Sequence, residues 1–229
     1  MNFVCVNFGD TYHNAYVDAL YYMLFMNNKI TKFICITDRK RNIRKEIEQI
    51  IINDSDYEGA WNKLYCFHDI ELPSEFILLD LDIVIQSKFK FNELKEIIIN
   101  DMLLFIQPNW AEDDRLYQST NINSSLLYIN RRLKSYNKIK KSINNGDWYP
   151  YATMDRYLYN ILSKKEIGYF NSLKTYSYLD NGFNEKVGYD ICLLNKFDGL
   201  FFNYINNDHW VFKYYPILLS YPSTYHIDL

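Results

Sequence analysis

Apolar and polar positions in the first fifty residues form two repeats of a short apolar run followed by a helically spaced segment. The runs at residues 3–6 and 32–37 predict β-strands, because brief apolar runs bounded by polar residues are typical of buried strands. Apolar residues at helical spacing predict a helix over residues 15–25. Isoleucines at positions 43, 47, 50 and 51 predict an amphipathic helix over residues 39–52, whose basic residues form a solvated face.

The rest of the chain continues this pattern less regularly. Strands are predicted over residues 76–79, 83–85, 102–106 and 125–129, and helices over residues 61–67, 91–99, 131–143 and 155–162. The polar stretch 108–119 is typical of a surface or site loop. Since no linker or internal repeat interrupts this order, we expect one α/β domain over residues 1–229, with a Rossmann-like first half and a more irregular second half.

Composition and charge exclude several classes of protein. The chain is 48% hydrophobic, which excludes a disordered chain, and its net charge of −3 gives it no global attraction to nucleic acid or anionic lipid. Aromatic residues make up 18% of the chain, with 22 Tyr. Tyrosine combines apolar area with a hydroxyl, which suits sugar or base recognition, but AT-rich codon usage produces the same bias.

Cysteine placement and the N-terminus indicate a cytoplasmic protein. The four cysteines have neither metal-site nor disulfide-framework spacing, and most lie in apolar runs where a thiol acts as a small buried hydrophobe. Met1 leads directly into the first predicted strand without the pattern of a signal peptide. No apolar run approaches the roughly 18 residues of a membrane span. We therefore expect a reduced, cytoplasmic protein with no transmembrane segment.

The strongest chemical signal is a pair of carboxylates, Asp80 and Asp82, in the apolar sequence FILLDLDIVI. Ligands of open α/β sheets bind outside the carboxyl ends of the strands, where this pair is expected to lie. Two adjacent carboxylates repel each other unless a cation lies between them, and hard divalent cations take carboxylate and phosphate oxygens together. The pair therefore predicts a metal site that binds a diphosphate, the alternative being two acids that cap a strand end in water.

Two enzyme classes use such a pair. In glycosyltransferases of the GT-A type, an Asp-x-Asp motif holds Mn²⁺ or Mg²⁺ against a nucleoside diphosphate. In haloacid-dehalogenase-like phosphatases, DxDx[TV] supplies a nucleophile, here Asp80, and the following Ile83-Val84 fits that pattern. The phosphatase motif normally lies on the first strand, whereas two βα units are predicted before Asp80, so the order of elements favours the transferase.

The chain resembles the GT-A glycosyltransferases related to family 8, including compact bacterial and large-virus versions. The matching segments run in the family's order: FGDTYHNAYV, FICITD, GAWNKLYCF, FILLDLDIVI and INSSLLYIN. The resemblance covers residues 3–130 and is thin beyond them. It implies a GT-A fold with a mixed central sheet flanked by helices, a nucleotide- and metal-binding half at residues 1–130 and an acceptor-side half at 131–229. It also implies transfer of a hexose from a UDP-sugar to a glycan, protein or other hydroxyl acceptor.

The resemblance assigns roles to individual residues. The metal, Mn²⁺ or Mg²⁺, is expected at Asp80 and Asp82. The nucleotide is expected at Asn7, Phe8, Thr11, Tyr12, Asp38, Lys63 and Leu81, and the transferred sugar at Asn123 and Ser124. Tyr12 would stack on the base, Asp38 would hydrogen-bond it, and Lys63 would approach the phosphates or the sugar. The alternatives are helix-start packing for Tyr12, a turn or helix cap for Asp38, and the start of a buried strand for Asn123 and Ser124.

Two departures from the family pattern leave roles open. The family's third metal ligand is a C-terminal His followed by Gly; here the candidates are His209 and Asn195, and neither reproduces the motif. In YATMDRYL, Asp155 matches an Asp that lies beneath the donor sugar, but Arg156 replaces the following Gln. Asp155 is accordingly a candidate for catalysis, as a base or an acceptor-orienting group, or else a helix N-terminal acid. A non-catalytic binder of nucleotide sugars is a further alternative.

Overall fold

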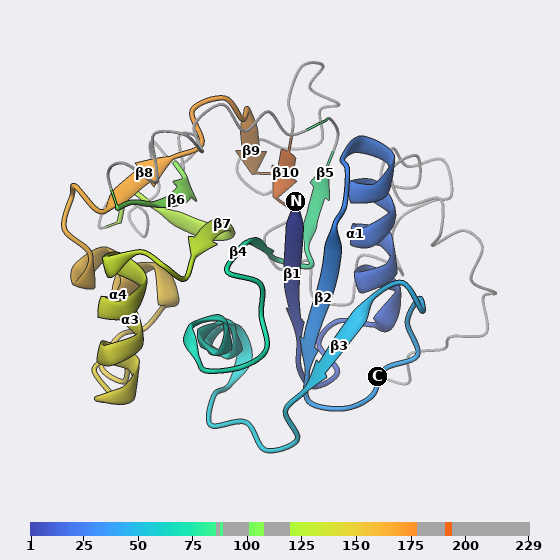
Figure 1. Ribbon diagram of the computed structural model, residues 1–229, viewed down its shortest axis with the longest axis horizontal. Helices are drawn as coiled ribbons and strands as arrows, with labels where there is room; N and C mark the ends of the chain where they lie inside the picture. Colours follow the sequence, from blue (N-terminus) through green and yellow to red (C-terminus); the bar gives the residue numbers. More distant parts are fainter. Residues whose placement is uncertain (86–87, 89–100, 108–119, 178–190, 194–229) are drawn as a thin grey trace.

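The computed structural model describes residues 1–85, 88, 101–107, 120–177 and 191–193, and its N-terminal part has the predicted βαβ order (Figure 1). Strand β1 covers Asn2–Asn7, helix α1 covers Asn14–Asn27, and strand β2 covers Lys32–Thr37. The side chain of His13 accepts a hydrogen bond from the backbone N–H of Ala15 at 3.2 Å and so caps the first turn of α1. Helix α1 buries most of its apolar residues in the core, among them Val17, Leu20 and Leu24.

The remaining described elements are short. They are β3 (Glu48–Ile51), the 3₁₀ helix η1 (Gly59–Phe67), β4 (Glu75–Leu79), β5 (Ile83–Ile85), β6 (Leu103–Ile106), β7 (Asn123–Asn130), α3 (Lys134–Asn144), α4 (Met154–Ile161), β8 (Ile167–Tyr169), β9 (Thr175–Ser177) and β10 (Ile191–Leu193). These elements confirm the strands and helices predicted from residue 61 onward, except for the helix at 91–99 and the loop at 108–119, which lie outside the described residues.

Seven strands form a mixed sheet in the order β3-β2-β1-β4-β7-β6-β8. Strand β7 runs antiparallel to both β4 and β6, while the other neighbouring pairs are parallel. A second sheet has the order β5-β10-β9. It is tied to α1 by a hydrogen bond of 3.4 Å from the backbone N–H of Ile85 to Sδ of Met23. The predicted α/β class with a mixed sheet is confirmed.

The helix predicted over residues 39–52 is wrong. The chain instead forms turns and bends after β2 and then strand β3, which pairs in parallel with β2, Ile36 opposite Ile50. Isoleucine favours strands, and the isoleucines at 43 and 47 lie in the irregular segment, where Ile47 is buried without a helical face. Spacing alone therefore misassigned a segment whose structure is set by pairing at the sheet edge.

Strand register brings the candidate site residues together at the carboxyl ends of the parallel strands. Cys5 of β1 lies opposite Leu79 of β4, and Asn7 lies opposite Thr37 of β2. Because these three strands are parallel, their carboxyl ends lie on the same side of the sheet. The segments that follow them, including Asp38 and Asp80, therefore begin on that side. Cys5, Cys35 and Cys66 are buried free thiols, which confirms the small-hydrophobe role predicted for the first two. Within the described residues, no helix has the length and apolar character to cross a membrane.

Candidate active site

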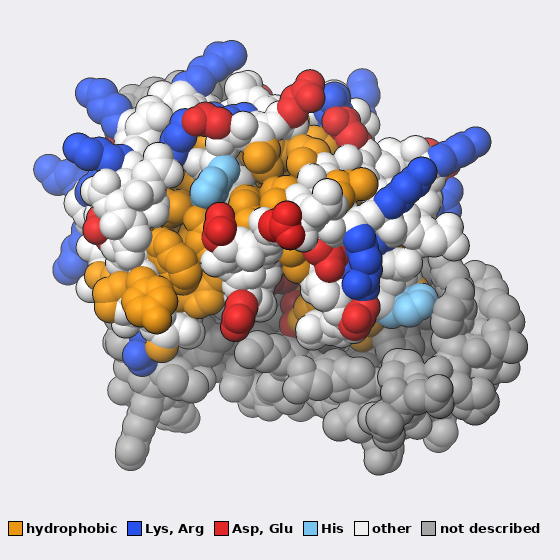
Figure 2. Space-filling view, turned by 90° about the horizontal axis from the view of Figure 1, so that it is seen from below, with side chains coloured by type: hydrophobic (Ala, Val, Ile, Leu, Met, Phe, Trp, Pro, Cys, Tyr) orange, Lys and Arg blue, Asp and Glu red, His pale blue; other side chains and the backbone are white. Residues whose placement is uncertain are grey.

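A cavity of about 360 Å³ opens where β1 and β4 end. Its lining consists of Val6, Phe8, Thr11, Tyr12, Gly59, Ala60, Lys63, Asp80, Leu81 and Asp82. Figure 2 shows the molecule from this side, with several acidic side chains around a hollow on this face. The structure thus brings together seven of the predicted site residues in one lining: Phe8, Thr11, Tyr12 and Lys63 join Asp80, Leu81 and Asp82.

Lys63 and Asp80 form a partly buried ion pair at the cavity. Nζ of Lys63 lies 2.6 Å from Oδ1 of Asp80, and the two side chains are only 11% and 21% exposed. The same ammonium donates to Oγ of Ser124 at 3.4 Å. Burial on its own lowers the pKa of Lys63, but Asp80 and then Asp155 outweigh it and raise that pKa. Lys63 is therefore held charged beside the first carboxylate of the motif.

Asp155 joins this cluster from the first turn of α4. Its Oδ1 accepts a hydrogen bond of 3.0 Å from the backbone N–H of Ser124, at the start of β7. Burial raises the pKa of Asp155 and Asp80 raises it further, while Lys63 and the Ser124 hydrogen bonds lower it without cancelling the effect. The structure thus places Asp155, Ser124, Lys63 and Asp80 in one group, drawn from α4, β7, η1 and the segment that follows β4.

Tyr12 is linked to the second carboxylate of the motif. Burial raises the pKa of Tyr12, and Asp82 and Asp80 raise it further, Asp82 also through a side-chain hydrogen bond. The Tyr12 phenol therefore stays protonated and acts as a donor. Its ring packs edge-on against Tyr16, with the ring centroids 5.3 Å apart. Helix-start packing, the alternative for Tyr12, is thus present, while stacking on a base stays a prediction.

The donor set at the cavity fits a hard divalent cation. Asp80 and Asp82 provide carboxylate oxygens, which Mn²⁺ and Mg²⁺ bind together with phosphate oxygens and water. Among the residues that the structure describes, no group of three or more His, Cys, Asp or Glu side chains is placed to hold a metal. The candidates for a third ligand, His209 and Asn195, lie outside the described residues.

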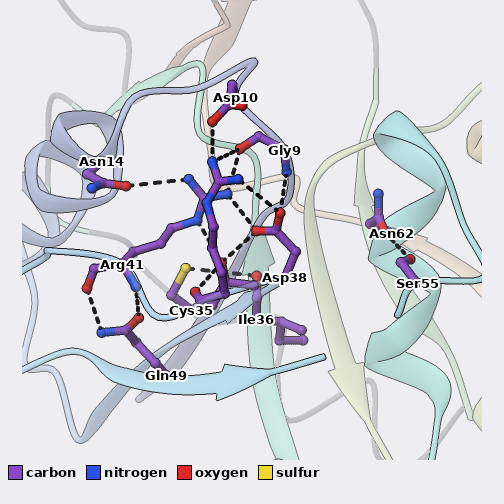
Figure 3. Close-up of polar contacts among 12 residues, drawn as sticks. Gly9, Asp10, Asn14, Cys35, Ile36, Asp38, Arg41, Gln49, Ser55 and Asn62 are labelled. Carbon is purple, nitrogen blue, oxygen red and sulfur yellow. Dashed lines mark hydrogen bonds and ion pairs between the residues drawn. The ribbon is translucent and has the colours of Figure 1, made fainter. Parts of the chain in front are cut away.

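Asp38 is engaged by the protein itself (Figure 3). Its Oδ2 accepts the backbone N–H of Gly9 at 3.2 Å, and its Oδ1 lies 2.8 Å from the guanidinium of Arg41. Arg39 lies 3.7 Å away. Burial alone would raise the pKa of Asp38, but the Gly9 amide and then Arg41 and Arg39 outweigh it, so the pKa lies below its ordinary value. Both oxygens therefore have protein partners, and binding of a base by Asp38 stays a prediction.

Arg41 connects three segments around Asp38. Its side chain, only 4% exposed, donates to Oγ1 of Thr37 at 2.6 Å, to the carbonyl of Gly9 at 2.6 Å and to Oδ1 of Asn14 at 3.4 Å (Figure 3). The sequence reasoning missed this residue because a solvated helix was predicted there. The available signal was an arginine three residues after the Asp of a Thr-Asp strand end.

The last residue of β1 has a buried side chain without a hydrogen-bond partner among the described residues. Asn7, at the end of β1, is 1% exposed, and neither its amide oxygen nor its amide nitrogen has a hydrogen-bond partner among the described residues. The next residue, Phe8, stacks on Tyr65 of η1 with centroids 5.7 Å apart. Thr11 and Tyr12 also line a second hollow of about 350 Å³ beside Arg39 and Arg41.

Asn123 is the first residue of β7, and its Oδ1 accepts a hydrogen bond from the backbone N–H of Ser125 at 2.9 Å.

Solved structures resemble this chain, although no protein-family model matches it and no curated protein sequence does. The galactosyltransferase LgtC, in complex with donor and acceptor sugar analogs, matches 96% of this chain and 95% of its own, with a TM-score of 0.61 and 13% identity. The apo form of the glycosyltransferase GlyE from Streptococcus pneumoniae TIGR4 matches 96% of this chain and 62% of its own, with a TM-score of 0.61 and 11% identity. These likenesses establish the fold, which is the GT-A fold that the resemblance predicted.

Proposed function

We propose that this protein is a metal-dependent glycosyltransferase that moves a hexose from a UDP-sugar to a glycan, protein or other hydroxyl acceptor. The observation that carries the proposal is the cavity at the ends of β1 and β4, lined by Asp80, Asp82 and Lys63 within a GT-A fold. The solved neighbour LgtC is a galactosyltransferase that was described with donor and acceptor sugar analogs, which agrees with this function.

The residues at the cavity have distinct proposed roles. Asp80 and Asp82 would hold Mn²⁺ or Mg²⁺, and the cation would supply positive charge to the diphosphate leaving group. Lys63, already charged and beside Asp80, would bind the phosphates, and Tyr12 would fix the position of Asp82 through its hydroxyl. The side-chain amide of Asn7, which has no hydrogen-bond partner among the described residues, would suit the imide edge of uracil.

The sugar is proposed to lie near Asn123 and Ser124, on the β7 side of the cavity. Ser124 contacts both Lys63 and Asp155, so a sugar beside Lys63 would also lie close to Asp155. Asp155, with its raised pKa, would accept a hydrogen bond from a sugar or acceptor hydroxyl and orient it for transfer.

Donor hydrolysis tests the proposal, because a transferase slowly hydrolyses its nucleotide sugar when no acceptor is present. UDP-glucose and UDP-galactose are incubated with the protein and Mn²⁺, and release of UDP is followed by chromatography. We expect release from at least one donor, with loss of at least about 100-fold in Asp80→Asn and in Asp82→Asn. Asp69→Asn, a carboxylate that is 80% exposed and does not line the cavity, is the matched control and should keep full activity.

The alternatives give different results in the same assays. Hydrolysis of p-nitrophenyl phosphate that disappears in Asp80→Asn, with no action on UDP-sugars, would identify the phosphatase. Binding of UDP by calorimetry that needs Mn²⁺, without any hydrolysis of either donor, would identify a non-catalytic binder.

A further inference from the structure

Aromatic side chains gather beside the cavity, on η1 and on the turn that follows α3. We define the aromatic surface as Trp61, Trp148, Tyr149 and Tyr151. The rings of Trp61 and Trp148 have centroids 5.2 Å apart, and those of Trp148 and Tyr149 are 5.9 Å apart. Tyr149 is 81% exposed, whereas the other three rings are half-buried. Residues almost ninety positions apart in sequence thus present their rings together.

The rings are held in place from beneath. Trp148 packs edge-on against the buried ring of Tyr57 at 5.1 Å, and Tyr151 packs against Tyr157 at 5.6 Å. The turn that carries Tyr149 is closed by hydrogen bonds from its own N–H to the carbonyl of Gly146 at 3.2 Å and from Tyr151 to Trp148 at 3.1 Å. Gly146 has a φ of 79°, a conformation that glycine adopts without strain. The exposed ring therefore projects from an ordered turn.

The aromatic surface adjoins the cavity through η1. Gly59 and Ala60 line the cavity and are exposed, Trp61 follows directly, and Lys63 lies two residues further along. Figure 2 shows hydrophobic side chains gathered on the same face as the hollow, on the side of α3 and α4. A molecule lying on these rings would therefore reach the cavity at Gly59 and Ala60.

We propose that the aromatic surface binds a carbohydrate acceptor by stacking its pyranose rings, an inference that rests on the proposed function and names its acceptor class. One face of a pyranose ring presents polarised C–H groups, which the negative face of an aromatic ring attracts, while its hydroxyls point outward to polar partners. Exposed carboxylates that can accept hydrogen bonds from such hydroxyls flank the surface at Asp56, Glu58 and Asp147. These negative charges also oppose an anionic lipid surface, so the rim favours a neutral sugar.

Disaccharide binding tests this inference with variants of Tyr149 in the full chain. Maltose, cellobiose, lactose and N,N′-diacetylchitobiose are the probes, with saturation-transfer NMR to detect binding and tryptophan fluorescence to measure Kd. We expect at least one to bind, Tyr149→Phe to bind it equally, and Tyr149→Leu to bind it about tenfold more weakly. Leucine keeps the apolar area and removes the ring. The matched control is Phe25→Leu, an aromatic residue that is 60% exposed on α1 and should change nothing.

Other results would contradict either the aromatic acceptor site or the proposed function. Absence of binding by all four disaccharides, or equal Kd values for wild type and Tyr149→Leu, overturns the aromatic acceptor site. UDP-sugar hydrolysis is measured in parallel on the same samples. Hydrolysis without disaccharide binding removes this inference and leaves the proposed function, whereas ring-dependent disaccharide binding without hydrolysis removes the transferase and leaves a carbohydrate site.

Discussion

Lys63 and Asp80 lie 2.6 Å apart, and that one ammonium also faces Asp155 across the start of β7. With Asp82 the group contains three carboxylates and one ammonium, so ionised carboxylates outnumber the cation. Such an excess is costly in a partly buried site and is relieved by a cation or by protonation. Burial is the main cause of the raised pKa of Asp155, and the neighbouring charge of Asp80 adds to it.

Replacing Lys63 should therefore expose the repulsion between the carboxylates. We expect Lys63→Met to lower the free energy of unfolding by about 2 to 3 kcal/mol without metal, because it leaves buried carboxylates without their cation. Adding Mn²⁺ should raise the free energy of unfolding of Lys63→Met by more than it raises that of wild type. Urea unfolding at neutral pH, with and without Mn²⁺, measures both effects. Lys63→Arg, which keeps the charge, is the control, and equal stability of Lys63→Met and wild type would contradict the argument.

Asn7 is expected to lower the stability of the fold and to strengthen ligand binding. Its buried amide has no partner among the described residues, and an unsatisfied buried polar group costs about 1 to 3 kcal/mol. Asn7→Leu, of similar shape, should therefore raise the unfolding free energy by about 1 kcal/mol while weakening UDP binding in calorimetry by about tenfold. A more stable protein with unchanged UDP affinity would assign Asn7 to the fold alone.

Acid should remove the contribution of Asp38. Its pKa in the folded protein lies below the ordinary value of 3.8, so the ionised form stabilises the fold above that pH and the stabilisation is lost as pH falls through the folded pKa. Asp38→Asn should thus be about 1 to 3 kcal/mol less stable than wild type at pH 7, and the difference should shrink below about pH 4.

Urea midpoints between pH 7 and pH 3 measure this effect. The control is Asp10→Asn, which removes a carboxylate that pairs with Arg39 but is 87% exposed, and it should leave stability nearly unchanged at every pH. A difference between Asp38→Asn and wild type that stays constant with pH would show that the carboxylate's charge is not what stabilises the turn.

Gly168 of β8 allows a close approach between strands. A Cβ at this position would lie 2.6 Å from Cδ2 of Leu104, a buried side chain of β6. Gly168→Ala should therefore cost about 1 to 3 kcal/mol by overpacking. Because Leu104→Val removes the contacting atom, the same glycine change should cost less in that background. A double-mutant cycle measures the coupling, and additive costs would refute it.

Local patterns predicted those parts of the fold whose structure is decided locally. The apolar run before Asp80 predicted β4, and helical spacing predicted α1, α3 and α4 with bounds that differ by a few residues from those observed. The segment after β2 was misassigned because the isoleucines fit a helix and a strand edge equally, and only pairing with β2 decides between them. Arg41 was missed for the same reason, since its burial follows from the path of that segment.

The candidate site was predictable from motifs but its connections were not. Sequence order and the family resemblance selected Lys63 and Asp155, yet the ion pair with Asp80 depends on η1, β4 and α4 meeting at one edge of the sheet. The aromatic surface joins a segment near residue 61 with one near residue 149, and no periodicity within either segment indicates that contact.

The position of the first strand inside the sheet, with a neighbour on each side, has a consequence for synthesis. Strand β1 can pair with β2 once residue 37 has emerged, but its other side has no partner until β4 has been synthesised. Strand β4 in turn has no partner on its far side until Asn123–Asn130 has been synthesised. On a ribosome adding about 5 to 20 residues per second, an apolar strand edge thus stays open for several seconds. A nascent chain shorter than about 130 residues therefore offers a template for intermolecular pairing, and a holdase chaperone that covers this edge should raise the yield of folded protein.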